Sequence, residues 1–201
     1  MVRREGKCQL YKGGDERAFQ VCRVWDEAAE QLNKIGLYLP EDYNSLKGVV
    51  SGRKVELRLG SEPWHKAHID LDNRVLEYYN DELDVQMNVL DLMEKTGAVC
   101  EFISPWEAEE EIVAKGSHVG VRCWWSKEQD KEVLENMPKI LAFATSMEAR
   151  IYEPTKYWPK ALSKNEQRVR EAMEALIEEW EQDEWYKLER KFDEIILKEI
   201  S

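Results

Sequence analysis

The sequence predicts an α+β protein in which helices pack on a mixed β-sheet, followed by a long C-terminal helix. Two observations support this fold class. Segments with the alternating polar and apolar pattern of a half-buried strand interleave with segments whose apolar residues recur every three or four positions, as on one helix face. A chain of 201 residues is also long enough to bury a substantial core. We expect one domain over residues 1–160 and a helical extension over residues 161–201.

The first predicted helix covers residues 16–35. Asp15 precedes it as a candidate N-cap, and Gly36 follows it where a left-handed residue commonly ends a helix. Its apolar residues share one face: Phe19, Cys22, Trp25, Ala29 and Leu32. Residues 37–48 contain proline and glycine and are expected to form a loop.

Three strands are predicted in the next part of the chain. Residues 54–59 alternate strictly between polar and apolar side chains, which is typical of a strand buried on one face. Residues 67–71 and 75–79 continue the same pattern on either side of Asp72-Asn73, a pair that favours a turn. We therefore expect these two strands to form a hairpin.

The second half of the predicted domain begins with a helix that starts at Asp81 or Asp84 and ends at Gly97. A strand over residues 98–103 and an acidic helical piece over residues 106–116 follow it. Another strand is expected over residues 118–125.

Ser126 and Gln129 form a capping box that predicts the start of a further helix. This helix is expected to run to about Met147 with a break or kink at Pro138, and residues 150–152 are expected to form a return strand. The predicted elements are compatible with two similar strand-helix-strand halves. The alternative is that the short strands and prolines of the two parts resemble each other by chance.

The C-terminal segment begins with a second capping box, Ser163 to Glu166, and contains no glycine or proline afterwards. A continuous helix over residues 163–201 would be about 57 Å long, more than this domain can cover. Either the helix bends near Gln182-Asp183, or part of it packs on another chain. We predict a homodimer whose interface includes five residues: Trp125, Trp180, Trp185, Leu188 and Phe192.

Composition excludes some classes of function. The chain carries 41 acidic and 29 basic side chains, and its net charge of −12 disfavours binding to nucleic acid. The basic residues Arg3, Arg4 and Lys7 are expected in a solvated tail. No apolar run is long enough to span a bilayer and no apolar leader is evident, so a cytoplasmic location without membrane contact is the expectation. The many Glu and Lys residues are typical of a thermophilic source.

The four cysteines are widely spaced and form no CxxC pair: Cys8, Cys22, Cys100 and Cys123. This spacing excludes the usual zinc motifs, and a disulfide framework is not expected in a chain of this size. We expect most of the four to behave as small buried hydrophobic residues.

The stretch around residues 65–77 has the densest set of potential metal ligands. His68, Asp70 and Asp72 alternate along a strand and should point to one side of the sheet, whereas His65 should point to the other. The first and last of the three would lie about 13 Å apart, so one divalent metal ion would also need Glu56 or Glu77. A solvated hairpin face is the competing interpretation.

No recognised catalytic motif occurs, whereas the chain contains eight tryptophans, a residue type enriched at protein interfaces. We therefore predict a non-catalytic regulatory or accessory protein that acts through protein-protein interaction and needs no cofactor. A metal-dependent hydrolase using the hairpin residues is the first alternative. An acidic mimic of nucleic acid is the second, and it predicts carboxylates clustered on one face.

Overall fold

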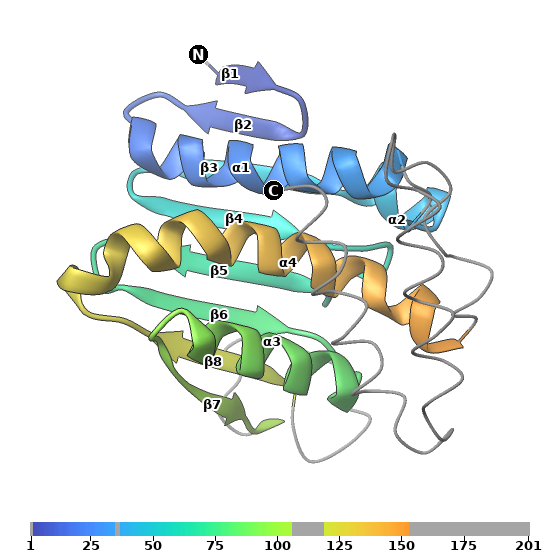
Figure 1. Cartoon of the computed structure of the whole chain (residues 1–201). Coiled ribbons are helices and arrows are strands. Elements are labelled where there is room, and N and C mark those ends of the chain that lie inside the picture. The colour runs from blue at the N-terminus through green and yellow to red at the C-terminus, as the bar shows by residue number, and fades with distance from the viewer. Residues whose placement is uncertain (1, 35–36, 106–118, 153–201) are drawn as a thin grey trace, which may run out of the picture.

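The structure is a computed structural model that describes residues 2–34, 37–105 and 119–152. Its centre is an eight-stranded mixed sheet with the strand order β1-β2-β3-β4-β5-β6-β8-β7 (Figure 1). The strands are β1 (Val2–Glu5), β2 (Cys8–Tyr11), β3 (Lys47–Ser51), β4 (Lys54–Arg58), β5 (Lys66–Asp70), β6 (Val75–Tyr79), β7 (Val99–Ile103) and β8 (Gly120–Trp124). Neighbouring strands are antiparallel except β2 and β3, which are parallel.

Three long helices lie side by side on one face of this sheet: α1 (Glu16–Lys34), α3 (Leu83–Lys95) and α4 (Asp130–Tyr152) (Figure 1). α4 lies between the other two and contacts both. The core fills the space between the helices and the sheet, where large side chains such as Trp25, Tyr78 and Phe143 are fully buried. The α+β class, with helices packed on a mixed sheet, is therefore confirmed.

Most of the predicted elements are present. α1 begins where expected, and a carboxylate oxygen of Asp15 accepts a hydrogen bond of 2.9 Å from the backbone N–H of Ala18. β5 and β6 form the predicted hairpin, with Asp70 opposite Val75. The capping box at Ser126 is also confirmed, although it opens a short 3₁₀ turn, η2 (Lys127–Gln129), that leads into α4.

Four elements in the first quarter of the chain were not predicted: β1, β2, α2 and β3. Residues 2–11 form the β1–β2 hairpin, so the expected solvated tail is wrong for Arg3, whose guanidinium stacks on Phe19 and pairs with Glu16 at 2.8 Å. The expected loop contains the short helix α2 (Pro40–Ser45), which starts at its proline. Proline fits the first turn of a helix because the backbone N–H it lacks has no partner there.

Of the break or kink expected at Pro138, the break is absent, and the strand expected over residues 150–152 is wrong. α4 continues as one helix from Asp130 through the proline to Tyr152. Residues 140–144, which follow the proline, are buried against the sheet and the other helices, with Leu141 and Phe143 fully inaccessible. Burial of this apolar face outweighs the one hydrogen bond that proline removes. The second of the two predicted strand-helix-strand halves therefore lacks its closing strand. The predicted helical segments 106–116 and 163–201 lie outside the described residues.

All four cysteines are paired in two disulfides, which corrects the expectation that no disulfides form. Cys8–Cys22 joins β2 to α1, and Cys100–Cys123 joins the directly opposed residues of β7 and β8. Cys8, Cys22 and Cys123 are fully buried, as predicted. Spacing along the sequence did not indicate the pairs, because the fold brings together residues that lie 14 and 23 positions apart.

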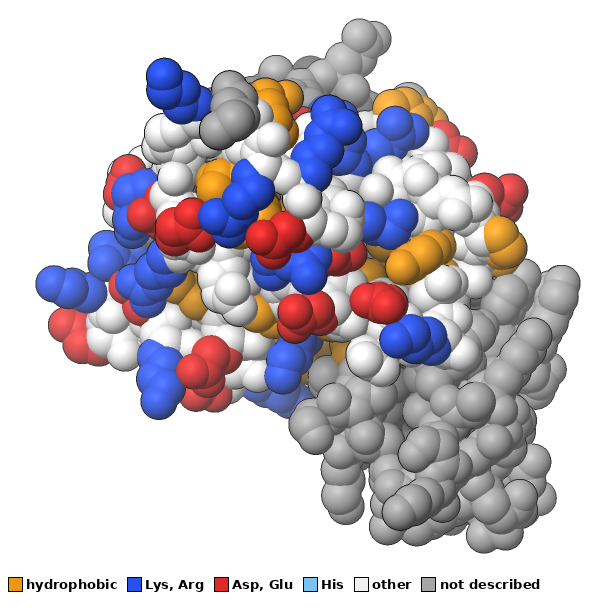
Figure 2. Space-filling view, turned by 90° about the horizontal axis from the view of Figure 1, so that it is seen from above, with side chains coloured by type: hydrophobic (Ala, Val, Ile, Leu, Met, Phe, Trp, Pro, Cys, Tyr) orange, Lys and Arg blue, Asp and Glu red, His pale blue; other side chains and the backbone are white. Residues whose placement is uncertain are grey.

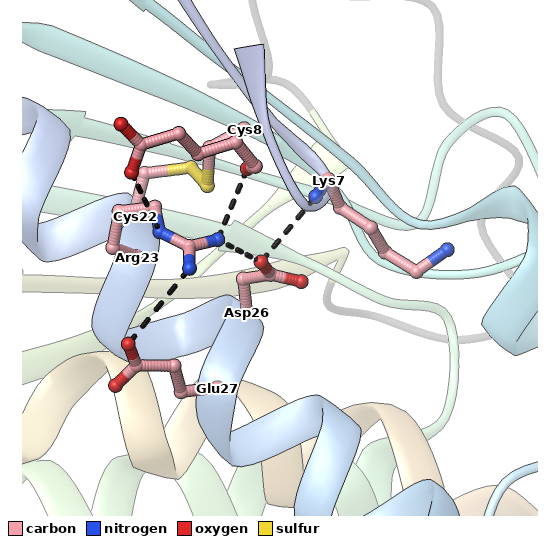
Figure 3. Close-up of a disulfide and its surroundings, with 7 residues drawn as sticks. Lys7, Cys8, Cys22, Arg23, Asp26 and Glu27 are labelled. Atoms are coloured by element: carbon pink, nitrogen blue, oxygen red, sulfur yellow. Dashed lines mark hydrogen bonds and ion pairs between the residues drawn. A yellow bond between two sulfur atoms is a disulfide. The ribbon is translucent and has the colours of Figure 1, made fainter.

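The surroundings of Cys8–Cys22 show how tightly α1 is attached to the first hairpin (Figure 3). Asp26 is buried one turn after Cys22; it pairs with Arg23 and accepts a hydrogen bond of 3.3 Å from the backbone N–H of Lys7. Arg23 also donates to the carbonyl oxygen of Glu5 at 3.0 Å. The hairpin turn is therefore held to α1 by a covalent bond and by charged contacts.

None of the helices within the described ranges is long and apolar enough to cross a membrane.

Candidate functional site: the polar face of the sheet

The most distinctive surface of the described structure is the sheet face opposite α1, α3 and α4, which we call the polar face. Side chains alternate along each strand, so that Val55, Leu57 and Ile69 point to the helices and are buried, while their neighbours point away. Strand register arranges those neighbours in rows across the sheet. The middle row contains Val49, Glu56, His68, Glu77, Arg122 and Glu101.

Two further rows flank the middle one. The row near the ends of β4 and β6 contains Lys47, Arg58, Lys66, Tyr79, Gly120 and Ile103. The row on the other side contains Ser51, Lys54, Asp70, Val75, Trp124 and Val99. The polar face thus mixes cationic, anionic and aromatic side chains, and Tyr79 and Ile103 at the β6–β7 end of the first flanking row are buried in a small apolar cluster with Val119.

A groove of about 650 Å³ is open along this face above β3, β4, β5 and β6. Its polar lining includes Glu56, His68 and Glu77, which are directly opposed on neighbouring strands. Glu77 accepts hydrogen bonds from Arg122 at 3.0 Å and from the Tyr79 hydroxyl at 3.2 Å. The ring of Tyr79 meets that of His68 edge to face, with 6.1 Å between centroids.

The three predicted metal ligands do not converge. His68 and Asp70 both line the groove, as their spacing predicted, but Asp72 lies in the turn and pairs with Arg53 at 2.6 Å. Asp70 accepts hydrogen bonds from the backbone N–H groups of Asp72 and Asn73 and from the Asn73 amide. Its main role in the structure is therefore to hold the β5–β6 turn.

The pKa of Asp70 reflects this role. Partial burial opposes its charged form, but the hydrogen bonds from Asn73 and Asp72 outweigh that effect and hold the pKa of the carboxyl below its usual range. Among the described residues, no group of three or more His, Cys, Asp or Glu is arranged to hold a metal ion. The carboxylate of Asp70 already accepts hydrogen bonds from its own turn and is therefore a poor metal ligand, which agrees with that finding.

His65 points to the helix-covered side, as predicted, where its Nε2 lies 2.9 Å from a carboxylate oxygen of Asp81. Both side chains are buried. The neighbouring cavity of about 10 Å³, which Asp42 and Thr145 also line, is too small for more than one water molecule. This buried pair is a structural feature of the core and offers no space for a substrate.

The two adjacent tryptophans lie on opposite sides of the sheet. Trp125 is 6% exposed, and its indole N–H donates to Asp130 at 2.8 Å. Trp124 is in the outer row of the polar face. Trp125 therefore has little surface to offer a partner, and Trp180, Trp185, Leu188 and Phe192, the other predicted interface residues, lie outside the described residues.

Asp130 is the centre of a polar cluster that sequence reasoning missed. Arg74, in a left-handed conformation after the β5–β6 turn, donates two hydrogen bonds to its carboxylate at 3.0 and 3.1 Å. Burial opposes the charged form, but hydrogen bonds from Arg74 and Trp125 outweigh it and lower the pKa of Asp130. The contact ties the start of α4 to the β5–β6 hairpin, 56 residues away in sequence.

Surface charges are mixed where the molecule is seen from its β1 end. Lys and Arg side chains alternate there with Asp and Glu, and hydrophobic side chains occur singly (Figure 2). A protein that mimics nucleic acid needs a surface of one sign. The face seen in Figure 2 does not have that property.

The sequence signals for the polar face were present but incomplete. Alternation placed Glu56 and Arg58 on one face of their strand and His68 and Asp70 on one face of theirs. Only the register between strands shows that Glu56 is opposite His68 and that Arg58 lies between Lys47 and Lys66.

No protein family model matches the chain, and neither the curated proteins nor the solved structures compared with it gave a match.

Proposed function

We propose that the chain is a non-catalytic regulatory or accessory protein that acts by binding another protein, with a second copy of the same chain as its first partner. The observation that supports this function is the polar face, a broad sheet surface with a groove and ordered rows of charged side chains. Sheet surfaces of this size can accommodate a partner helix or strand, and their charges determine which partner fits.

The chemistry of the groove supports binding better than catalysis. The carboxylates of the groove are already engaged within the protein. Glu77 forms an ion pair with Arg122, and Asp70 accepts hydrogen bonds from its own turn. A general acid or base needs a free approach to substrate. Both carboxylates are instead held by contacts within the protein.

Gel filtration with light scattering tests the proposed function on the full chain. We expect a mass of twice 23.7 kDa. Substitution of Trp180 and Trp185 by alanine should shift the population towards monomer, because buried tryptophans commonly dominate interface energies. A protein that remains monomeric at every concentration tested would contradict the proposed homodimer.

The metal-dependent hydrolase with a site on the hairpin of residues 65–77 is the alternative proposal, although Glu56, His68 and Glu77, which are opposed on neighbouring strands, are not arranged to hold a metal ion. Metal analysis of the purified protein and thermal unfolding with Mn²⁺ or Zn²⁺ test it. A bound metal, or a rise in melting temperature that His68→Ala abolishes, would support this alternative. No metal and no shift would remove it.

Cytoplasmic location is also part of the proposal, and the two disulfides limit the kinds of organism in which such a protein would be cytoplasmic. Disulfides are rare in the cytosol of mesophiles but common in intracellular proteins of hyperthermophiles. We therefore propose a cytoplasmic protein from an organism that grows at high temperature. A melting temperature above about 90 °C is expected, whereas one of about 45–65 °C would contradict an origin at high temperature.

A further inference from the structure

We infer that the disulfide Cys100–Cys123 is a redox switch, which a dithiol reduces in the folded protein and which then releases the edge strand β7 from β8. Cys8–Cys22 stays oxidised under the same conditions. The inference does not depend on the proposed self-association, because it needs no second chain. It is carried by the burial of the two disulfides, by their places in the fold and by the contacts that hold β7.

The two disulfides differ in how much of their surface solvent can reach. Cys8 and Cys22 are both 0% exposed, and β3 packs against them so closely that a Cβ atom at Gly48 would collide with the sulfur of Cys22. Cys123 is also 0% exposed, but its partner Cys100 is only half-buried. A disulfide is cleaved by a thiolate that reaches one of its sulfur atoms. Cys100 is therefore the cysteine at which a thiolate from solvent can attack.

The sheet determines from which side this thiolate approaches. Cys100 and Cys123 are directly opposed on antiparallel strands, so their bond crosses from β7 to β8. A thiolate attacks in line with the S–S bond, from the side opposite the sulfur that leaves. β7 is the last strand of the sheet, so the line that extends beyond Cys100 leads out of the sheet edge (Figure 1). Beyond Cys123 the same line leads towards β6 and the interior of the sheet.

Cys8–Cys22 has no corresponding open side. It joins the inner strand β2 to α1, which packs on the sheet, and charged side chains flank it (Figure 3). One of them, Asp26, is 6% exposed and pairs with Arg23. A thiolate can reach these sulfur atoms only after α1 separates from the hairpin, and an opening of that size is rare in a folded protein.

Reduction by a dithiol proceeds through two exchanges. One thiolate of the dithiol attacks the Sγ of Cys100 and forms a new S–S bond, while the bond to Cys123 breaks and its electron pair leaves on the Sγ of Cys123, which takes up a proton. The second thiolate of the dithiol then attacks the sulfur of the first, and Cys100 leaves with its electron pair and is protonated. The protein gains two electrons and two protons, and the dithiol becomes a disulfide.

The first half of β7 depends strongly on this bond. Val99 is 68% exposed, and of the five residues of β7 only Ile103 is buried. Glu101 is exposed and pairs with Arg122 at 3.4 Å, and an exposed ion pair adds little stability. After reduction, residues 99–101 are held mainly by the backbone ladder to β8. A ladder at the edge of a sheet, with few buried side chains, opens at low cost.

Release of this half uncovers the edge of β8. Val99 and Cys100 lie opposite Trp124 and Cys123, so the backbone groups of β8 that face them become accessible to water. Ile103 remains in its buried cluster with Tyr79 and Val119 and anchors the other end of β7. The switch is therefore a local opening of one strand, while Cys8–Cys22 keeps the opposite edge of the sheet closed.

Timed alkylation of the native full chain tests which disulfide is reduced. Samples taken during incubation with dithiothreitol are quenched with N-ethylmaleimide, and their peptides are identified by mass spectrometry. We expect label on Cys100 and Cys123 at least about tenfold faster than on Cys8 and Cys22. With glutathione, which has one thiol, the trapped mixed disulfide should lie on Cys100. Equal rates for the two pairs, faster reduction of Cys8–Cys22, or glutathione on Cys123 would overturn the inference.

Hydrogen exchange measures the release of β7. Reduction of Cys100–Cys123 in the unaltered chain should raise amide exchange in residues 99–101 and in β8 at least about tenfold, and leave β2 and β3 unchanged. Cys100→Ala with Cys123→Ala should show the raised exchange without reductant. The matched control, Cys8→Ala with Cys22→Ala, should still respond to dithiothreitol at β7. Selective reduction that leaves exchange at β7 unchanged would show that the bond is labile but is not a switch.

Discussion

At the scale of single residues, Asp130 is the polar side chain whose contacts matter most for the fold. It receives two hydrogen bonds from Arg74 and one from the Trp125 indole, and its side chain is 15% exposed. These contacts link α4, the β5–β6 hairpin and the residue after β8. Asparagine at this position would keep one acceptor oxygen and replace the other by an NH₂ group, so at least one of these hydrogen bonds is lost together with the charge.

We predict that Asp130→Asn lowers the free energy of unfolding by about 1–3 kcal/mol, measured by urea denaturation near neutral pH. Glu135→Gln is the matched control, because Glu135 is exposed on the same helix. Its effect should stay within about 0.5 kcal/mol. Equal stability of the two variants would show that the cluster around Asp130 contributes nothing.

Acid sensitivity follows from the same residues. The pKa values of Asp70 and Asp130 are lowered in the folded state, so the unfolded state binds more protons in acid. The stabilisation they give is present above their ordinary pKa of about 4 and is lost as pH falls through the lower folded values. The unfolding free energy should therefore fall as the pH drops below about 5, and less steeply in Asp130→Asn.

At the scale of elements, the two disulfides attach the outer strands to the rest of the fold. Cys8–Cys22 fixes β2 to α1, and Cys100–Cys123 fixes the edge strand β7 to β8. Both restrict the unfolded chain by closing loops of 14 and 23 residues. Restriction of the unfolded chain is the usual source of disulfide stabilisation.

We predict that replacing Cys8 and Cys22 together by alanine lowers the unfolding free energy by about 2–4 kcal/mol, and that replacing Cys100 and Cys123 has a similar effect. Denaturation with and without reductant measures both. Each double variant should become less sensitive to reductant than the unaltered chain. Identical unfolding curves in oxidised and reduced protein would contradict the structural role of these bonds.

The contact between β3 and α1 depends on a glycine. A Cβ atom at Gly48 would collide with the sulfur of Cys22 and lie 3.2 Å from Leu57 and 3.3 Å from Trp25. We predict that Gly48→Ala lowers the free energy of unfolding by about 1–3 kcal/mol, because the packed side chains around it cannot move aside to admit a methyl group. Ser51→Ala, at an exposed position of the same strand, is the control and should be nearly neutral in the same denaturation experiment.

At the scale of the whole molecule, periodicity in the sequence was enough to predict the fold class and most of the helices and strands. It failed where tertiary contacts decide the outcome. Burial of Phe143 and its neighbours keeps α4 helical past Pro138, and the disulfide to α1 together with the Arg3 contacts orders the first hairpin.

The candidate site was predictable only in part, for a related reason. Alternation assigns His68 and Asp70 to one side of a strand, but the partners of each residue depend on strand register. Register places Glu56 and Glu77 beside His68 and aligns three cations across β3, β4 and β5. Neither arrangement follows from spacing within one strand, so the polar face emerged only from the assembled sheet.

Native mass spectrometry of the full chain, after light and heavy isotope-labelled copies are mixed and equilibrated, tests the proposed self-association most directly. We expect three dimer masses near twice 23.7 kDa: light with light, heavy with heavy, and a mixed species at about half of the total. A spectrum that contains only the two monomer masses, at concentrations up to about 100 μM, would contradict the proposal that this protein acts by binding a second copy of itself.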